Sequence, residues 1–316
     1  MKLISRYTLA KYLYALLGRI SLRKLKSMLL KPPTLSAEEI SAALQELPIN
    51  PGDDVMIHGS LSAFGHIEGG AETVVDVLLK VIGPQGNLLA PSFSRFEVRI
   101  GEFGRWWDPL STPVYTGAIS DAIWRRPSAL RSFHPTHAVA ALGPRSKYYI
   151  TGHNLTGDRP SFWGTGAFSS DSPWQKMVDE NVHYLMFGCG FGPATLCHHV
   201  ETFMVAEDLA GLPESEYKGF TQALRHNYYH PDGAWPDINR TKLAKAIYCQ
   251  GSISSIKLGW ASIEHIRAAD YFEAAIALCR ANQDEWFSPK YRAWQKLIQS
   301  RRAQIQNFQP AEHSHS

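Results

Sequence analysis

Residues 195–201 combine the residue types that a general base requires. His198 is followed three positions later by Glu201, and Thr195 precedes both as a candidate helix cap. Residues three apart lie on one face of a helix, so the carboxylate can orient the imidazole and raise its basicity. Such an imidazole can take a proton from a reacting group. The alternative is a structural His–Glu pair on a capped helix.

A loop rich in serine and glycine follows the apolar run 54–58, which predicts a buried strand. The loop leads into a predicted helix over 72–81, so it presents free backbone N–H groups and the positive end of a helix dipole. Such groups bind phosphate. The loop is neither a P-loop nor a dinucleotide-binding fingerprint, and an ordinary strand-to-helix turn stays open as the alternative.

A third segment, residues 131–137, holds His134 and His137 on either side of Pro135. Histidines three apart can bind a metal from a helix, but the proline predicts an extended loop. A turn with hydrogen-bonded histidines is therefore the favoured interpretation. A metal hydrolase stays open as an alternative, with His134, His137, His198 and Glu201 as its functional residues.

Taken in order, these segments resemble the aminoglycoside 3-N-acetyltransferase family, also called the antibiotic N-acetyltransferases. The resemblance extends over about residues 38–283. Its hallmarks lie at residues 58–65, 69–70, 90–94, 131–137, 171–173 and 195–201. Two positions depart from the family's usual pattern: Gly59 stands where a serine is usual, and Ala138 where a small hydroxyl residue is frequent.

The resemblance implies transfer of an acyl group from acyl-coenzyme A, either acetyl-CoA or a short hydroxyacyl-CoA, to an amine on a sugar, without a metal. It implies that His198 deprotonates the amine; we assign Glu201 to orient His198, with Asp171 as a second candidate for that role. The residues expected to hold coenzyme A are His58, Ser60, Leu61, Ser62, Gly69, Gly70, Ser92 and Ser132.

Cys197 adjoins His198 and raises the alternative of an acyl-cysteine intermediate. Neighbouring residues of a helix point about a hundred degrees apart, so we expect Cys197 to be packed in the core. The transfer is therefore predicted to be direct.

The charge distribution bears on the acceptor. The net charge of +3 divides into +8 for the N-terminal leader, −7 for residues 38–283 and +2 for residues 284–316. Aminoglycosides are polycations, so an enzyme that binds them needs an acidic cleft. A net charge of −7 makes residues 38–283 only mildly acidic. Arginine and tryptophan side chains suit a diphosphate and a base. We therefore expect a nucleotide-linked amino sugar of the 3-amino-deoxyhexose type, for surface polysaccharide biosynthesis. Aminoglycoside acetylation conferring antibiotic resistance is the alternative. The substrate-binding candidates are Arg95, Trp106, Trp107 and His134.

The elements that must position these residues alternate between strands and helices. Such alternation predicts an α/β layered sandwich, with a central mixed, partly parallel sheet flanked by helices. A capping box, Ser36 and Glu39, opens the first helix of this region. A long helix is predicted over 264–281, turns and short strands over 211–260, and a loop over the site at 94–116.

Three parts are expected: a basic amphipathic leader (1–37), an N-acyltransferase domain (38–283) and a helical C-terminal extension (284–316). The longest apolar stretch of the leader is too short to span a bilayer. We favour packing of the leader on the body or on a partner subunit over contact of residues 1–31 with a membrane surface. We expect a cytoplasmic protein with reduced cysteines, and a homo-oligomer is compatible with the sequence. The small net charge argues against nucleic-acid binding. A non-catalytic coenzyme A-binding or membrane-associated assembly protein stays open.

Overall fold

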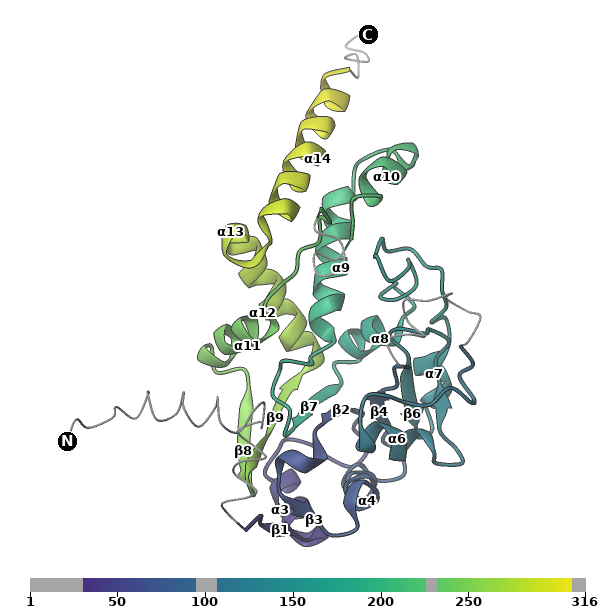
Figure 1. The fold of residues 1–316 in the computed structure, drawn as a ribbon, viewed down its shortest axis with the longest axis vertical. Helices are drawn as coiled ribbons and strands as arrows, with labels where there is room; N and C mark the ends of the chain where they lie inside the picture. The colour runs from purple at the N-terminus through teal and green to yellow at the C-terminus, as the bar shows by residue number, and fades with distance from the viewer. Residues whose placement is uncertain (1–30, 95–106, 226–231, 309–316) are drawn as a thin grey trace, which may run out of the picture.

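A mixed β-sheet forms the centre of the molecule (Figure 1). The computed structural model describes residues 31–94, 107–225 and 232–308. Within these residues the main sheet has seven strands in the order β5-β6-β4-β2-β7-β9-β8. Strand β2 (Val55–Gly59) runs parallel to both its neighbours, β4 (Leu88–Pro91) and β7 (His183–Phe187), and the other pairs are antiparallel. The predicted α/β fold with a partly parallel sheet is confirmed.

The outer strands flank this parallel centre. They are β5 (Leu130–Arg131), β6 (Val139–Leu142), β9 (Ala261–Arg267) and β8 (Ser254–Leu258). A separate parallel pair consists of β1 (Thr34–Leu35) and β3 (His66–Ile67).

One face of the main sheet packs on helices near the N-terminal part of the chain. Side chains alternate between the two faces of a strand, so Val55 and Ile57 of β2 join this core whereas Met56 joins the opposite one. The same alternation turns His58 toward the face of Met56. The helices on the first face are α3 (Ala37–Gln45), α4 (Gly70–Ile82) and α6 (Ala118–Trp124).

The opposite face carries the larger core, into which α9 and α12 pack side by side (Figure 1). Tyr184 and Met186 of β7 point into it, as expected from the alternation. The helices that contribute to this core are α7 (Ser146–Ile150), α8 (Pro173–Asp179), α9 (Leu196–Leu209), α10 (Glu214–Thr221), α11 (Arg240–Cys249), α12 (Ala268–Ala281), α13 (Gln283–Trp286) and α14 (Pro289–Phe308).

Local signals predicted some elements and failed for others. The capping box is present, with Ser36 Oγ accepting from Glu39 N and Glu39 Oε2 accepting from Ser36 N. The helix predicted over 264–281 is wrong at its start, because Glu264 and the residues after it pair with β7 as part of β9. Residues 211–260 contain one short strand, β8, as predicted, but also two helices, α10 and α11, that were not predicted.

The leader prediction concerns residues that lie outside the described ranges, apart from the last few. No helix among the described residues is long and apolar enough to cross a bilayer. In the C-terminal extension, α13 and α14 pack on the body: Tyr291 is fully buried and Ile298 is almost so. The three-part division of the chain stays a prediction.

Candidate active site

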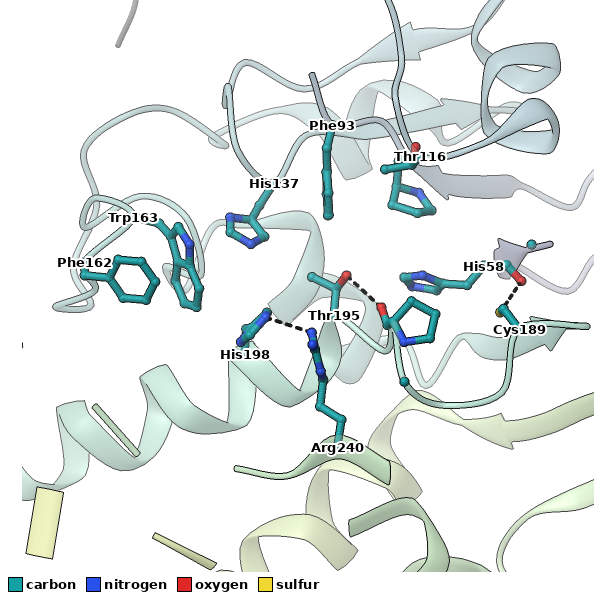
Figure 2. Close-up of a pocket in the computed structure, with 14 residues that line it drawn as sticks. His58, Phe93, Thr116, His137, Phe162, Trp163, Cys189, Thr195, His198 and Arg240 are labelled. Atoms are coloured by element: carbon teal, nitrogen blue, oxygen red, sulfur yellow. Dashed lines mark hydrogen bonds between the residues drawn. The ribbon is translucent and has the colours of Figure 1, made fainter. Parts of the chain in front are cut away.

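A cavity of about 650 Å³ opens where the three parallel strands end (Figure 2). In open α/β sheets, ligands bind in the crevice outside the carboxyl ends of such strands. Its lining residues come from the ends of β2 and β4, from the loop after β7, from the loops that hold residues 116, 137 and 162–163, and from the starts of α9 and α11. They are His58, Gly59, Pro91, Phe93, Thr116, His137, Phe162, Trp163, Cys189, Gly192, Pro193, Thr195, His198 and Arg240. We call this the His198 cavity.

His198 and Glu201 form the pair that the sequence predicts. Glu201 Oε2 lies 2.7 Å from His198 Nδ1, and both residues stand in the first turns of α9. The side chain of Glu201 is 2% exposed and that of His198 is 16% exposed. The carboxylate is therefore sealed behind the ring, and the ring itself reaches the cavity.

Three donors hold the Glu201 carboxylate. Besides His198, the indole of Trp235 donates to Oε2 at 2.9 Å, and the backbone N–H of Ile238 donates to Oε1 at 2.7 Å. Burial alone would raise the pKa of Glu201, but the electrostatic interaction with His198 and these hydrogen bonds outweigh it, so the pKa lies below its ordinary value. Glu201 is therefore ionised at neutral pH.

The neighbours of His198 determine its tautomer. An ionised carboxylate only accepts, so Nδ1 carries the proton toward Glu201. Arg240 Nη1 lies 3.2 Å from Nε2, and a guanidinium only donates, so Nε2 presents a lone pair. That lone pair faces the cavity, as a general base requires.

Aromatic rings fix the plane of the His198 imidazole. The ring of Trp163 lies 4.5 Å from it between centroids, and the ring of His137 lies 5.9 Å away in an edge contact. Thr195 occupies the N-cap position of α9, but its side chain makes no capping hydrogen bond, contrary to the prediction.

His58 is tied to the start of α9 through Tyr184. The Tyr184 hydroxyl accepts from Leu196 N at 3.3 Å, so its own proton can be donated to His58 Nε2, 2.8 Å away. Burial, with a smaller contribution from the charge of Arg240, lowers the pKa of His58 to about 3. His58 is therefore a neutral wall of the cavity at physiological pH.

A second cavity, of about 680 Å³, lies over the serine- and glycine-rich loop, and we call it the loop cavity. Gly59 lines both cavities, so they adjoin. Gly69 caps α4 in a left-handed conformation with no side-chain hydrogen bond, which leaves the first N–H groups of that helix free of a side-chain cap. The predicted residues that line this cavity are Ser60, Leu61, Ser62, Gly69 and Gly70.

Neither cavity is lined by the predicted site residues Asp171, Ser92, Ser132 and His134. Asp171 is exposed and does not hold His198, whose nitrogens contact Glu201 and Arg240 instead. The other three are fully buried in structural contacts: the Ser92 carbonyl accepts from Arg131, Ser132 Oγ accepts from Val139 N, and the His134 ring stacks on His153.

Trp107, one of the predicted nucleotide contacts, also lines neither cavity. Trp107 is 6% exposed, and its ring packs under the Arg131 guanidinium, 4.4 Å away, because a cation above an indole face is favourable. Arg95 and Trp106 lie outside the described residues.

Neither cysteine near the site has the features of a nucleophile. Cys197 is fully buried and points into the core, as predicted, and burial raises its pKa well above the ordinary value. Cys189 does line the His198 cavity, but burial raises its pKa to about 12, so its thiol stays protonated.

The metal hydrolase alternative requires histidines that converge on one point. The His134 ring instead stacks on His153, with centroids 4.9 Å apart, and the Arg240 guanidinium occupies the free side of His198 Nε2. In the described ranges, no group of three or more His, Cys, Asp or Glu side chains could hold a metal ion.

Sequence reasoning missed several wall residues of the His198 cavity, above all Arg240, Trp163 and Phe162. The last two form a close aromatic pair, with centroids 3.8 Å apart, in a loop without regular structure. An aromatic pair in a loop was an available signal. No local signal distinguishes Arg240 from other arginines at helix starts.

Comparison with known proteins agrees with this architecture. The family model described as aminoglycoside 3-N-acetyltransferase matches residues 56–280. Aminoglycoside N(3)-acetyltransferase VII of Streptomyces paromomycinus is 32% identical over 196 residues, which cover 57% of this chain and 63% of that relative. The match therefore spans less than two thirds of the relative's length.

Solved structures share the fold. The aminoglycoside acetyltransferase AAC(3)-IVa has a TM-score of 0.63 at 23% identity and covers 83% of this chain and 95% of its own. AAC-IIIb, solved as a binary complex with CoASH, has a TM-score of 0.59 at 19% identity, with 81% and 99% covered. Because the family model matches most of its length, this chain belongs to the aminoglycoside 3-N-acetyltransferase family.

Proposed function

We propose that the protein transfers an acetyl group from acetyl-CoA to the amino group of an aminoglycoside-type amino sugar. The observation that carries the proposal is the His198–Glu201 pair, whose Nε2 lone pair faces a cavity at the carboxyl ends of the parallel strands. Family membership supports the same reaction class and favours aminoglycosides over the nucleotide-linked acceptor expected from the sequence.

The side chains have separate roles in this reaction. His198 Nε2 takes one proton from the amine as its nitrogen attacks the thioester carbon, and returns that proton to the departing thiolate of coenzyme A. Glu201 holds the Nδ1–H and stabilises the imidazolium that forms. No cysteine takes part, so the transfer is direct.

The loop cavity is the proposed seat of the coenzyme A phosphates. Free N–H groups at the start of α4 and the glycines around them suit an anion, and the shared residue Gly59 lets the pantetheine arm pass to His198. Ser62 is exposed at this loop. Ser62→Glu places a negative charge beside the phosphates and is expected to raise the KM for acetyl-CoA about tenfold, with an unchanged acceptor KM.

Ser252→Glu is the matched control, because Ser252 is exposed on the turn before β8, away from both cavities. It should leave both KM values unchanged. If Ser62→Glu and the control had the same KM for acetyl-CoA, the proposal that the phosphates bind at this loop would be wrong.

A nucleotide-linked amino sugar is the second candidate acceptor. Among the described residues that line the His198 cavity there is no aspartate or glutamate, and Arg240 contributes a positive charge. Such a lining favours an acceptor with fewer positive charges than an aminoglycoside carries.

The direct test is thiol release from acetyl-CoA with kanamycin-type aminoglycosides and with nucleotide-linked amino sugars, with mass analysis of the products. We expect acetylated aminoglycoside with the native protein and none above background with His198→Ala. Turnover of nucleotide-linked sugars alone would select the second candidate. If the protein bound coenzyme A but acetylated no amine, it would be a non-catalytic coenzyme A-binding protein.

A further inference from the structure

Arg240 projects from the start of α11 into the His198 cavity (Figure 2). It follows Asn239, whose side chain caps the helix by accepting from Lys242 N at 2.9 Å. This capped turn holds the backbone in place, and Arg240 Nη1 reaches to 3.2 Å from His198 Nε2. The guanidinium therefore sits beside the atom that must receive a proton in the reaction.

The guanidinium of Arg240 has no carboxylate partner within the described part of the chain. Other arginines there, such as Arg126, Arg145 and Arg301, form ion pairs with aspartate or glutamate. A guanidinium that lines a cavity without a carboxylate partner can bind a negative charge. Its field also acts across the cavity, where it helps to keep His58 neutral.

Orientation of His198 does not require this contact. Glu201 already fixes Nδ1, and Trp163 already packs on the ring. A donor on Nε2 competes with the acceptor amine for the lone pair, so the contact must break when the amine binds. The binding of the amine thus releases Arg240 N–H groups next to the reacting atoms.

The distances place the developing charge within reach of Arg240. An amine that is hydrogen-bonded to Nε2 lies about 3 Å from it. The carbonyl carbon that it attacks is at most about 3.5 Å further, and closes to bonding distance as the reaction proceeds. The carbonyl oxygen then falls in the region that the released guanidinium can reach, because Nη1 starts only 3.2 Å from Nε2.

We propose that Arg240 is a catalytic residue whose guanidinium stabilises the oxyanion formed when the amine attacks acetyl-CoA; this rests on the acetyl transfer proposed above. The amine lone pair forms the N–C bond, and the C=O π pair moves onto the oxygen beside Arg240. One amine proton passes to His198 Nε2. The oxyanion then re-forms C=O, the C–S bond breaks, and the sulfur takes the pair and the proton from His198.

The first experiment replaces the charge. In Arg240→Gln we expect kcat to fall about 10²–10³-fold, the loss typical for removal of one oxyanion donor, with the KM for acetyl-CoA changed less than threefold. Arg240→Lys keeps a charge with different reach and should lose less. Lys242→Gln on the same helix, whose ammonium pairs with Glu285 away from the cavity, should match the native enzyme.

A double-mutant cycle separates catalysis from positioning. If Arg240 acted only through His198, Arg240→Gln would have no effect in a His198→Ala background. We expect a further loss of at least tenfold in that background, measured on the slow hydrolysis of acetyl-CoA, which passes through the same oxyanion and needs no acceptor. Circular dichroism and thermal unfolding check that each variant is folded.

Chemical rescue gives a readout that is independent of folding differences. Guanidinium ion at non-denaturing concentration should restore part of the activity of Arg240→Ala and leave His198→Ala unchanged. An Arg240→Gln variant with native kcat and a raised acceptor KM would show that Arg240 binds the acceptor, and would overturn the proposal. The proposal would also be overturned if Arg240→Gln left the rate of acetyl-CoA hydrolysis unchanged in the His198→Ala background. Native protein that acetylates no amine would instead refute the proposed function.

Discussion

The segments around His198 and His134 look alike in sequence, but His198 and His134 differ in burial, hydrogen bonding and access to the cavity. Each holds a second histidine and a hydroxyl residue within three positions. His198 has a carboxylate on one nitrogen and a cavity at the other. His134 is fully buried and stacks on a further histidine, and its Nδ1 accepts from the Thr136 hydroxyl and the backbone N–H of His137.

The difference shows what turns an imidazole into a base. Burial without a carboxylate lowers the pKa of His134 to about 3, so this ring is a neutral packing group at any physiological pH. His198 keeps partial exposure, and Glu201 stabilises the protonated form that catalysis must pass through. Access and a buried anion, more than the histidine itself, define the site.

The largest expected effect comes from removing the base. His198→Ala should lower kcat about 10³-fold, within the range for loss of general-base catalysis, whereas His134→Gln should change kcat less than threefold in the folded protein. Steady-state kinetics with acetyl-CoA and the preferred amine measure both. A similar loss of kcat in both variants would contradict the assignment of His198 as the base and His134 as a packing residue.

Neutralising the buried anion should have the next largest effect. In Glu201→Gln, an amide cannot stabilise the imidazolium, so kcat should fall about 10²-fold. Asp171→Asn is the control and should be silent, because Asp171 is exposed and does not contact His198. Single-turnover acetyl transfer reports the difference, and a loss confined to Asp171→Asn would reverse the assignment.

The buried histidines should make the fold sensitive to acid. A histidine whose pKa is about 3 when folded and about 6.5 when unfolded contributes stability that is full above pH 6.5 and is lost as pH falls toward 3. Each such group removes about 1.4 kcal/mol per pH unit well below 6.5. Urea unfolding at pH 7, 6 and 5 should show a shallower loss for His134→Gln than for the native protein.

His66→Gln is the control for this measurement, since His66 is exposed at β3. It should reproduce the native pH dependence. Identical slopes for His134→Gln and the native protein would show that His134 is not held neutral by burial.

The smallest effect is expected at Cys197. Its thiol is sealed in the core beside the base, so Cys197→Ser should change kcat less than threefold, with a loss of stability of about 1 kcal/mol from a buried hydroxyl. Kinetics and urea unfolding measure the two quantities separately. A folded but inactive Cys197→Ser enzyme would contradict direct transfer and favour an acyl-cysteine intermediate.

Periodicity predicted the central strands and most helices because those elements depend on their own residues. The apolar run at β2 and the amphipathic pattern of α4 are local properties. The helix predicted over 264–281 failed at its first residues, because Glu264 pairs with Met186 of β7 and that contact overrides local preference. The helices within 211–260 were missed because α10 has no buried residue to mark a core-facing side, and α11 packs against α12, a segment further along the chain.

The sequence alone determined the His198–Glu201 pair, since three-residue spacing on a helix is local geometry. Only the tertiary structure decided that this pair faces a cavity while His134 does not, and that Trp235, Ile238 and Arg240 complete it. The physical reason is that the spacing of residues in the sequence determines only which side chains lie next to each other within a turn of helix. Solvent access, dielectric environment and opposing charge arise where segments far apart in sequence pack together.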